Sequence, residues 1–552
     1  MMRRVLYILL AAVALPTLAA AQVSKQVEVS KDYTPSVSAA QKMAIVPDMT
    51  DTVKMRPDID YSIEPRTFQT SLLTENFKPA TITYWDFYRA RPLYVRLASG
   101  APLASEADVY VSAFNKDRGY AMAYINHWGD YRNRINMAGE KITDKTTEMS
   151  NRVGGRAGLF VGRHTLEVDL GADQQIRHRY PTTGAAIRFG KVAGRLRFGD
   201  DFVDLSRWNF NLEVGGEYFL DGLNVSDFNE SALSSKVALG KMVGGKHLLR
   251  LHAEYDGDFG YKALKNYRNN TFMAGARYGF NSERFEFLIG ADYYYDDVAS
   301  VTSSPHHIFP YLRMTWKRPT TGFVPYVEVD GGLRENDFAT LIYRNPFLRA
   351  SGAVAEALPK LANESVYNGR VGFGGVLGGI FSYNLSAELS LADNHAYWYN
   401  YGAEYYFAEA YQHSLHIDLS AKLRPIGWFE AELTAGAYAW ENYDDYYSSR
   451  PSFETELALR FTGRKLRAGV NVGYRGAINW MTLTDVDGGS QPVMQKVKTD
   501  GTFLVGAEVE WRINDRWGVY AEGRNLAGSN IYEWLCYYTD SPQGLLGVKF
   551  SF

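Results

Sequence analysis

The chain has 552 residues, with 59 Lys and Arg against 62 Asp and Glu, so its formal net charge is −3. This near-neutral, slightly acidic balance argues against nucleic acid or an anionic membrane face as a partner. Aromatic residues make up 14% of the chain, Tyr (39) outnumbers Phe (29), and the single cysteine, Cys536, excludes an intrachain disulfide framework.

The first residues predict export. Arg3 and Arg4 precede an apolar stretch over residues 5–20, and residues 19–21 are three alanines of the kind found at signal-peptide cleavage sites. A membrane anchor is the alternative, but the apolar run is short for a spanning helix. We therefore expect a signal peptide over residues 1–21 and a mature chain that begins at Gln22. Past residue 21, no run approaches the roughly 18 uncharged apolar residues that a membrane helix needs.

Residues 22–91 differ from the rest of the chain in composition and in the pattern of apolar residues. Prolines interrupt short extended patches, and few apolar residues cluster together. This composition predicts an extended segment in the periplasm or in a lumen, and no independent domain.

From residue 92 onward the dominant signal is a period of two. In residues 466–475, for example, Leu466 and Val470 share one face, whereas Arg467 and Asn471 share the other. Such alternation predicts antiparallel strands with one apolar and one polar face. The pattern recurs in residues 165–173, 209–219, 249–256, 284–293, 415–423, 429–440, 453–461 and 503–512.

Alternation alone also fits a soluble sandwich, but three features favour a membrane barrel. Tyr and Trp lie near strand ends, as in interfacial girdles. Short and long connections alternate along the chain. The last segment, residues 544–552, places Phe550 and Phe552 on one face and resembles the terminal strand that the barrel insertion machinery recognises in outer-membrane proteins. The candidate girdle residues are Tyr293, Tyr295, Trp316, Trp428, Trp440 and Trp511.

The connections allow a count of strands. Longer connections, such as 127–150, 336–365, 393–412 and 482–500, are expected to be extracellular, and the short turns periplasmic. About ten such turns, with both termini inside, predict an all-β, transmembrane, antiparallel up-and-down barrel of about 22 strands (range about 18 to 22) over residues 92–552. The expected turns are 115–118, 162–164, 200–207, 243–246, 281–283, 317–322, 383–385, 424–427, 462–465 and 514–515.

Residues 517–532, followed by Pro542 and the Gly-rich strand 544–550, resemble the last hairpin of TonB-dependent outer-membrane receptors. The resemblance implies their barrel. Those receptors carry an N-terminal plug of well over 100 residues, whereas only about 70 residues precede the barrel here. The resemblance therefore supports the barrel fold, and it supports energised uptake much less. Residues 26–30 faintly resemble the short N-terminal stretch that pairs with the energy-coupling protein in those receptors.

Two groups of residues are candidate sites. Charged side chains on the polar strand faces are expected to line the lumen, either as a selective channel wall or as cross-strand ion pairs on a wet wall. The aromatic side chains of residues 393–412 are expected either to form an extracellular contact rim for a sugar or protein, or to be girdle residues that pack on one another. The lumen candidates are Glu213, Glu254, Glu328, Glu430, Arg460 and Arg512. The rim candidates are Tyr397, Trp398, Tyr399, Tyr401, Tyr405 and Tyr406.

No catalytic, cofactor-binding or metal-binding motif is visible, and we expect a protein that is not an enzyme. The favoured function is a plugless channel or transporter for small solutes, related in architecture to the uptake receptors. The alternative is a structural or assembly component that binds a surface lipoprotein or envelope-biogenesis machinery. The expected partners are outer-membrane lipid and the barrel insertion machinery.

Overall fold

The computed structural model describes residues 92–132, 134, 142, 146–178, 186–222, 228–298, 304–317, 322–348, 362–402, 404–441, 449–484, 492–539 and 541–552. The predicted signal peptide and the segment 22–91 lie outside these residues. None of the helices among the described residues is both long and apolar enough to cross a membrane.

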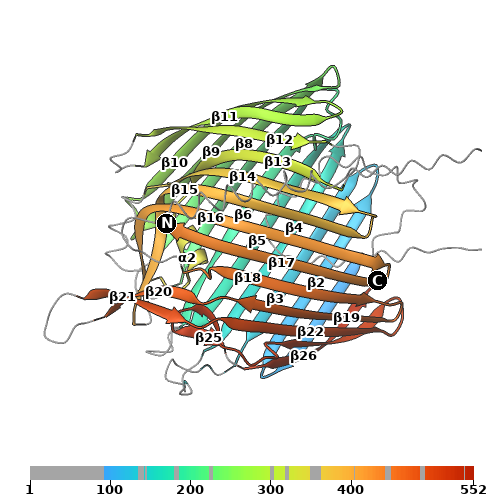
Figure 1. Ribbon diagram of the computed structural model, residues 1–552, viewed down its shortest axis with the longest axis vertical. Helices are drawn as coiled ribbons and strands as arrows, with labels where there is room; N and C mark the ends of the chain where they lie inside the picture. The colour runs from blue at the N-terminus through green and yellow to red at the C-terminus, as the bar shows by residue number, and fades with distance from the viewer. Residues whose placement is uncertain are drawn as a thin grey trace, which may run out of the picture. The chain divides into compact units, whose positions relative to one another are not determined.

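Twenty-two antiparallel strands close into one barrel, which confirms the fold and the strand number expected from the sequence. The ring closes where the first strand pairs with the last, with Val95 opposite Phe550. Figure 1 shows the strands running across the molecule side by side. The wall strands are β1 (Leu93–Ala101), β2 (Ala104–Asn115), β3 (Gly119–Asp130), β4 (Glu148–Val161), β5 (His164–His178), β6 (Ala186–Gly199), β7 (Asn209–Asp221), β8 (Phe228–Val243), β9 (His247–Lys262), β10 (Arg268–Asn281), β11 (Phe285–Val298), β12 (His306–Trp316), β13 (Val324–Arg334), β14 (Glu364–Leu377), β15 (Phe381–Tyr401), β16 (Glu404–Ile426), β17 (Phe429–Glu441), β18 (Phe453–Thr462), β19 (Leu466–Arg475), β22 (Thr502–Arg512), β23 (Trp517–Arg524) and β26 (Gln543–Ser551).

Two further hairpins belong to the long connections. Strands β20 (Ile478–Thr484) and β21 (Val493–Thr499) pair with each other between β19 and β22, and β19 pairs directly with β22. Strands β24 (Ile531–Trp534) and β25 (Tyr537–Thr539) form a small separate sheet between β23 and β26. Both hairpins therefore stand at the end of the barrel that carries the long connections, which is the extracellular end in single-chain barrels.

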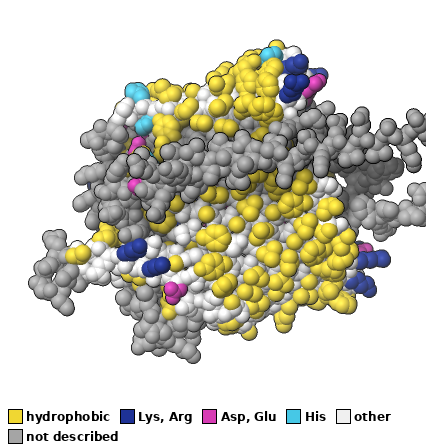
Figure 2. Space-filling model, viewed as in Figure 1, with side chains coloured by type: hydrophobic (Ala, Val, Ile, Leu, Met, Phe, Trp, Pro, Cys, Tyr) yellow, Lys and Arg dark blue, Asp and Glu magenta, His cyan; other side chains and the backbone are white. Residues whose placement is uncertain are grey.

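The outer face of the wall is apolar. On β7, Leu212 and Val214 are 43% and 50% exposed, and Glu213 between them points to the opposite, lumenal face. Figure 2 shows hydrophobic side chains spread over the outside of the strands. All the expected girdle residues except Trp440 are among the exposed large hydrophobics. A closed barrel with such a surface is an outer-membrane protein, because closure satisfies the backbone and the apolar face meets lipid.

Nine of the ten expected short turns lie between the strands that they were expected to join. The expectation of a turn at 383–385 is wrong, because these residues lie inside β15. The turn is at Gly378 and Gly379, whose φ angles of 60° and 69° require left-handed backbone that glycine adopts without strain. Gly372 makes room for the ring of Tyr326 on the neighbouring strand, because a Cβ at position 372 would lie 2.5 Å from that ring.

The expectation of a long loop over 393–412 is also wrong. The two strands continue through it and turn only near Gly402, so β15 and β16 reach 21 and 23 residues. A register shift between Ala392 and His395 explains the error, because the bulge breaks the alternation that identifies a strand.

The first part of the long connection between β13 and β14 folds inward. We call residues 335–348 the inward segment. It contains α2 (Phe338–Arg344), whose N-cap Asp337 accepts a hydrogen bond from the Thr340 N–H at 2.6 Å. In Figure 1, α2 lies near the end of the barrel that carries β20, β21 and β25. This end of the barrel therefore contains a packed core of its own.

Candidate functional site

The predicted lumen charges lie on the inner face of the wall, and each has an oppositely charged neighbour. The pairs are Glu213 with Arg195 (3.6 Å), Glu254 with Lys236, Glu328 with Arg370 (3.5 Å), Glu430 with Lys422 (2.8 Å) and Arg460 (3.1 Å), and Arg512 with Glu510 (3.6 Å). Most of these pairs are partly solvated, so each contributes about 0–1 kcal/mol to stability. The wall that they line is wet, charged and largely neutralised.

A well-enclosed pair on this wall is Arg277 with Asp292, whose side chains are 11% and 9% exposed. The guanidinium donates two hydrogen bonds to the carboxylate, at 2.7 and 2.5 Å, and His252 Nε2 lies 2.9 Å from the same carboxylate. The ring of Tyr311 lies 4.1 Å from the guanidinium carbon. This cluster ties together β9, β10, β11 and β12 from inside the lumen.

A second cluster lies across the seam where the barrel closes. Arg96 on β1 donates to the Tyr520 hydroxyl at 2.7 Å and to Glu522 at 3.1 Å, both on β23. Arg96 also lies 3.2 Å from Glu106 on β2. Arg524 on β23 donates back to the same Glu106 at 2.5 Å. The seam is thus held by side chains as well as by the backbone pairing of β1 with β26.

The inward segment packs against the inner face of the wall at the extracellular end of the barrel. Phe338 is fully buried and stacks on Phe228 of β8, with ring centroids 4.9 Å apart. Phe219 of β7 meets Phe338 edge-on. The hydroxyl of Tyr343 donates to Asp173 on β5 at 2.5 Å, so the helix is anchored to this side of the lumen by both apolar and polar contacts.

The other end of the inward segment reaches the opposite wall. Phe347 stacks on Tyr537 of β25, and Leu348 pairs in a single β-bridge with Tyr405 of β16. Tyr405 donates to the Leu535 carbonyl at 3.1 Å. Trp480 of β20 belongs to the same buried cluster. The cluster therefore spans the mouth from β6–β10 to β16 and the two hairpins.

The burial of this cluster indicates that the inward segment is stably packed. Five side chains of the inward segment are almost fully removed from solvent: Phe338, Leu341, Ile342, Phe347 and Leu348. At about 1.5–3 kcal/mol per buried large apolar side chain, they contribute on the order of 10 kcal/mol as an upper estimate. Opening the mouth through this segment would therefore require an input that offsets a substantial packing energy.

The six aromatic rim candidates fall into different environments. Tyr397 and Tyr405 are buried, so these two present no contact surface. Trp398 packs edge-on against Trp534 of β24. Tyr399 stacks on Tyr406 across the hairpin, with centroids 5.6 Å apart, and Tyr401 near the tip is 40% exposed. The hairpin thus contributes one side to the closure and leaves only part of its aromatic surface for an external partner.

The terminal aromatics differ from each other. The Phe550 ring packs against Trp517 at 4.5 Å, whereas Phe552 is 54% exposed and lies beneath the guanidinium of Arg516.

One cluster of acidic side chains was not predicted from the sequence. Asp258, Glu335 and Asp337 bring three carboxylates together among the residues that the structure describes. Burial and neighbouring carboxylates raise the pKa of Glu335 to about 8, and burial raises the pKa of Asp337. The available signal was two acidic residues at alternate positions, followed by Phe338, at the start of a long connection.

No family model and no curated protein matches the chain. Solved structures do match the fold. The FrpB iron transporter of Neisseria meningitidis superimposes with a TM-score of 0.64 at 12% identity, over 84% of this chain and 82% of that one. The siderophore receptor PirA from Acinetobacter baumannii gives 0.65 at 10%, over 85% and 81%. The copper transporter OprC gives 0.62 at 14%, over 85% and 81%.

These likenesses define the class of fold: an outer-membrane barrel of the kind found in TonB-dependent receptors, as the last hairpin predicted. The solved structures that it resembles are transporters and receptors.

Proposed function

We propose that this chain is an outer-membrane channel or transporter for small solutes. In this proposal, the inward segment gates the extracellular mouth. A ring of 22 strands is wide enough for an aqueous path unless something fills it. The similar solved structures named above are an iron transporter, a copper transporter and a siderophore receptor, which supports a transport role.

The observation that carries the proposal is the nature of the closure. The inward segment packs across the mouth by side chains, and among the described residues its only β-pairing is the bridge between Leu348 and Tyr405. A segment held in this way can move aside without breaking any ladder of the barrel wall. This is the arrangement expected of a gate, because a closed and an open state then share one scaffold.

The pairing of opposite charges on the lumen wall affects which solutes we expect the channel to favour. Because each of the six predicted lumen charges is paired with a charge of opposite sign, the part of the wall that they line presents no strong field of one sign. We therefore expect weak discrimination between anions and cations in the open state.

The test compares three purified proteins in planar bilayers and in liposome-swelling assays. These are the mature chain from Gln22, the chain without residues 22–91, and the chain in which a Gly-Ser linker replaces residues 335–363. The linker variant is expected to conduct small ions and to admit sugars, and the mature chain to conduct far less. A linker variant that is folded but remains impermeable, with and without residues 22–91, would overturn the proposal.

A second candidate function, a scaffold for a surface lipoprotein or an assembly complex, is favoured by the β15–β16 hairpin. This hairpin extends the two longest strands, with Tyr401 exposed near its tip. A photo-crosslinking amino acid at position 401 tests this idea in intact cells. A single defined adduct with a lipid-anchored protein would support the scaffold, and the absence of any protein adduct would count against it.

A further inference from the structure

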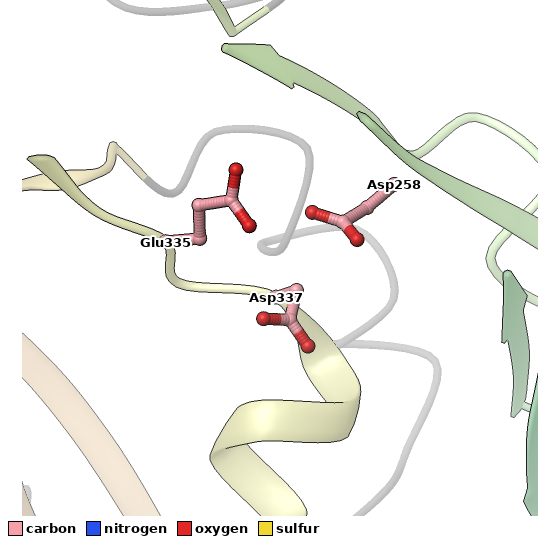
Figure 3. A group of neighbouring side chains, drawn as sticks. All are labelled: Asp258, Glu335 and Asp337. Carbon is pink, nitrogen blue, oxygen red and sulfur yellow. The ribbon is translucent and has the colours of Figure 1, made fainter. Parts of the chain in front are cut away.

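The carboxylates of Asp258, Glu335 and Asp337 converge on one point. Asp258 lies on β9, whereas Glu335 and Asp337 flank Asn336 at the start of the inward segment. One carboxylate oxygen from each residue lies within 4.8 Å of the other two. Figure 3 shows the Asp258 carboxylate pointing from the wall toward the two acidic residues of the segment. The group therefore joins the barrel wall to the element that closes its mouth.

Two buried oxygen atoms at this place have no hydrogen-bond partner among the described residues. Asp258 is 3% exposed, and its Oδ2 is unpartnered while the carboxylate points into the group. Glu230 of β8, which is 2% exposed, uses Oε2 to accept from the Ala339 N–H at 2.8 Å, and its Oε1 is unpartnered. Leaving buried charged oxygens without partners is costly, so each indicates a ligand that the protein chain does not supply.

The surrounding charges point to a cation. Glu213, Glu328 and Glu430 of the lumen wall are each paired with Lys or Arg. No ion pair among the described residues involves Glu230, Asp258, Glu335 or Asp337. The donors that reach the group are neutral: Thr340 N–H for Asp337 and the Thr271 side chain for Glu335. Several carboxylates cannot remain ionised together in a buried place without positive charge between them.

We propose that Asp258, Glu335 and Asp337 bind a divalent cation of the calcium type, with Glu230 beside them adding negative charge. The ligands are all oxygen atoms, which hard cations prefer. Two oxygens that each lie about 2.4 Å from one Ca²⁺ are at most about 4.8 Å apart, so three oxygens within 4.8 Å of one another can reach a single ion of this size. The bound ion would tie the inward segment to β9 and hold the mouth closed. The binding site stands independently of transport, and only its effect on the gate rests on the proposed function.

Binding is tested on the purified full-length barrel in detergent after treatment with EDTA. Isothermal titration with CaCl₂ should give one site per chain with a Kd near or below the roughly 10⁻⁴–10⁻³ M of extracellular calcium modules. Terbium luminescence, excited through the aromatic side chains, should report the same site, and MgCl₂ should compete weakly. Asp258→Asn and Glu335→Gln should each weaken binding at least tenfold.

The matched control is Asp297→Asn, the same chemical change at an exposed carboxylate that pairs with Arg268 at 3.0 Å. It should bind Ca²⁺ as the unchanged protein does. The two site variants should also remain folded without Ca²⁺, because they remove like charges from a buried place. Absence of a site in the unchanged protein, or equal binding by Asp258→Asn and Glu335→Gln, would overturn the cation site.

Conductance with and without Ca²⁺ separates the site from the gate. The proposal expects EDTA to raise the open fraction of the unchanged protein and to have no effect on Asp258→Asn. Binding at one site with no change in conductance would overturn the tether while leaving the cation site in place. A barrel that never conducts in any variant contradicts the transport role, and the titration result still decides the cation site.

Discussion

The ring of Phe347 lies flat on the ring of Tyr537, with centroids 3.4 Å apart and 12° between the planes. The first residue belongs to the inward segment and the second to the hairpin that precedes the last wall strand. Their contact joins two connections that are far apart in the sequence and start from different parts of the ring. It is therefore a direct place to weaken the closure without touching the wall.

Phe347→Ala should open the mouth. Truncating a buried Phe costs about 3–5 kcal/mol, which corresponds to a rise in the open fraction by a factor of roughly 100 or more. Single-channel recording should detect this as more frequent opening at unchanged conductance per opening. Phe503→Ala, at a lipid-facing position that is 58% exposed, is the control and should leave opening unchanged. Equal behaviour of the two variants would contradict the closure.

Cys536 offers an independent view of the same closure. The thiol is the only one in the chain and lies at the turn between β24 and β25, where burial raises its pKa to about 11. Because the thiolate is the reactive form, maleimide labelling of the native protein should be slow at pH 8 and rise about tenfold per pH unit toward pH 11. In Phe347→Ala, labelling at pH 8 should be at least tenfold faster. A native rate equal to that of a free thiol would count against this prediction.

The enclosed pair on the lumen wall should matter more for stability than the solvated pairs. Asp292→Asn leaves Arg277 without its bidentate partner, and breaking such a buried pair costs about 3–5 kcal/mol. Glu454→Gln breaks a solvated pair with Arg475 and should cost less than about 1 kcal/mol. Urea-induced unfolding from lipid vesicles, followed by tryptophan fluorescence, measures both. Similar losses would show that the Arg277–Asp292 pair is as solvated as the other.

Phe552→Ala should reduce assembly and leave stability nearly unchanged. The ring is half exposed, so its removal from the folded barrel costs little, whereas the terminal strand resembles the element that the insertion machinery recognises. The amount of folded barrel in outer-membrane fractions should fall severalfold, and the protein refolded in detergent should unfold at the same urea concentration. The result expected for Phe503→Ala is normal assembly, so a similar drop in both variants would exclude a specific terminal signal.

The wall could be predicted from the sequence because its rules are local. The alternation of apolar and polar residues along one strand shows which side chains face lipid and which face the lumen. The number of short turns gives the number of strands. The misplaced turn shows where this reasoning fails. Gly378 and Gly379 sit in a glycine-rich run that reads as strand, and only their left-handed backbone identifies the turn.

The closure could not be predicted in the same way. It depends on which distant residues meet inside the ring, and Phe228, Tyr405 and Tyr537 share no local pattern with Phe338. One signal was available. Phe338, Leu341 and Ile342 have helical apolar spacing inside a connection expected to face water, and such a stripe requires a buried partner.

The side chains at the seam between β1 and β26 make contacts that differ between a complete barrel and an incomplete one. Arg96 is near the start of the wall, and its partners Tyr520 and Glu522 come from the penultimate strand. A chain interrupted before that strand leaves this guanidinium with its partners on β2 only, Glu106 and Asp108, and without the two from β23. The full set of Arg96 contacts therefore forms only when the last wall strands have been added to the barrel. An incomplete chain also leaves the free edge of β1 unpaired, whereas in the complete barrel β26 covers it.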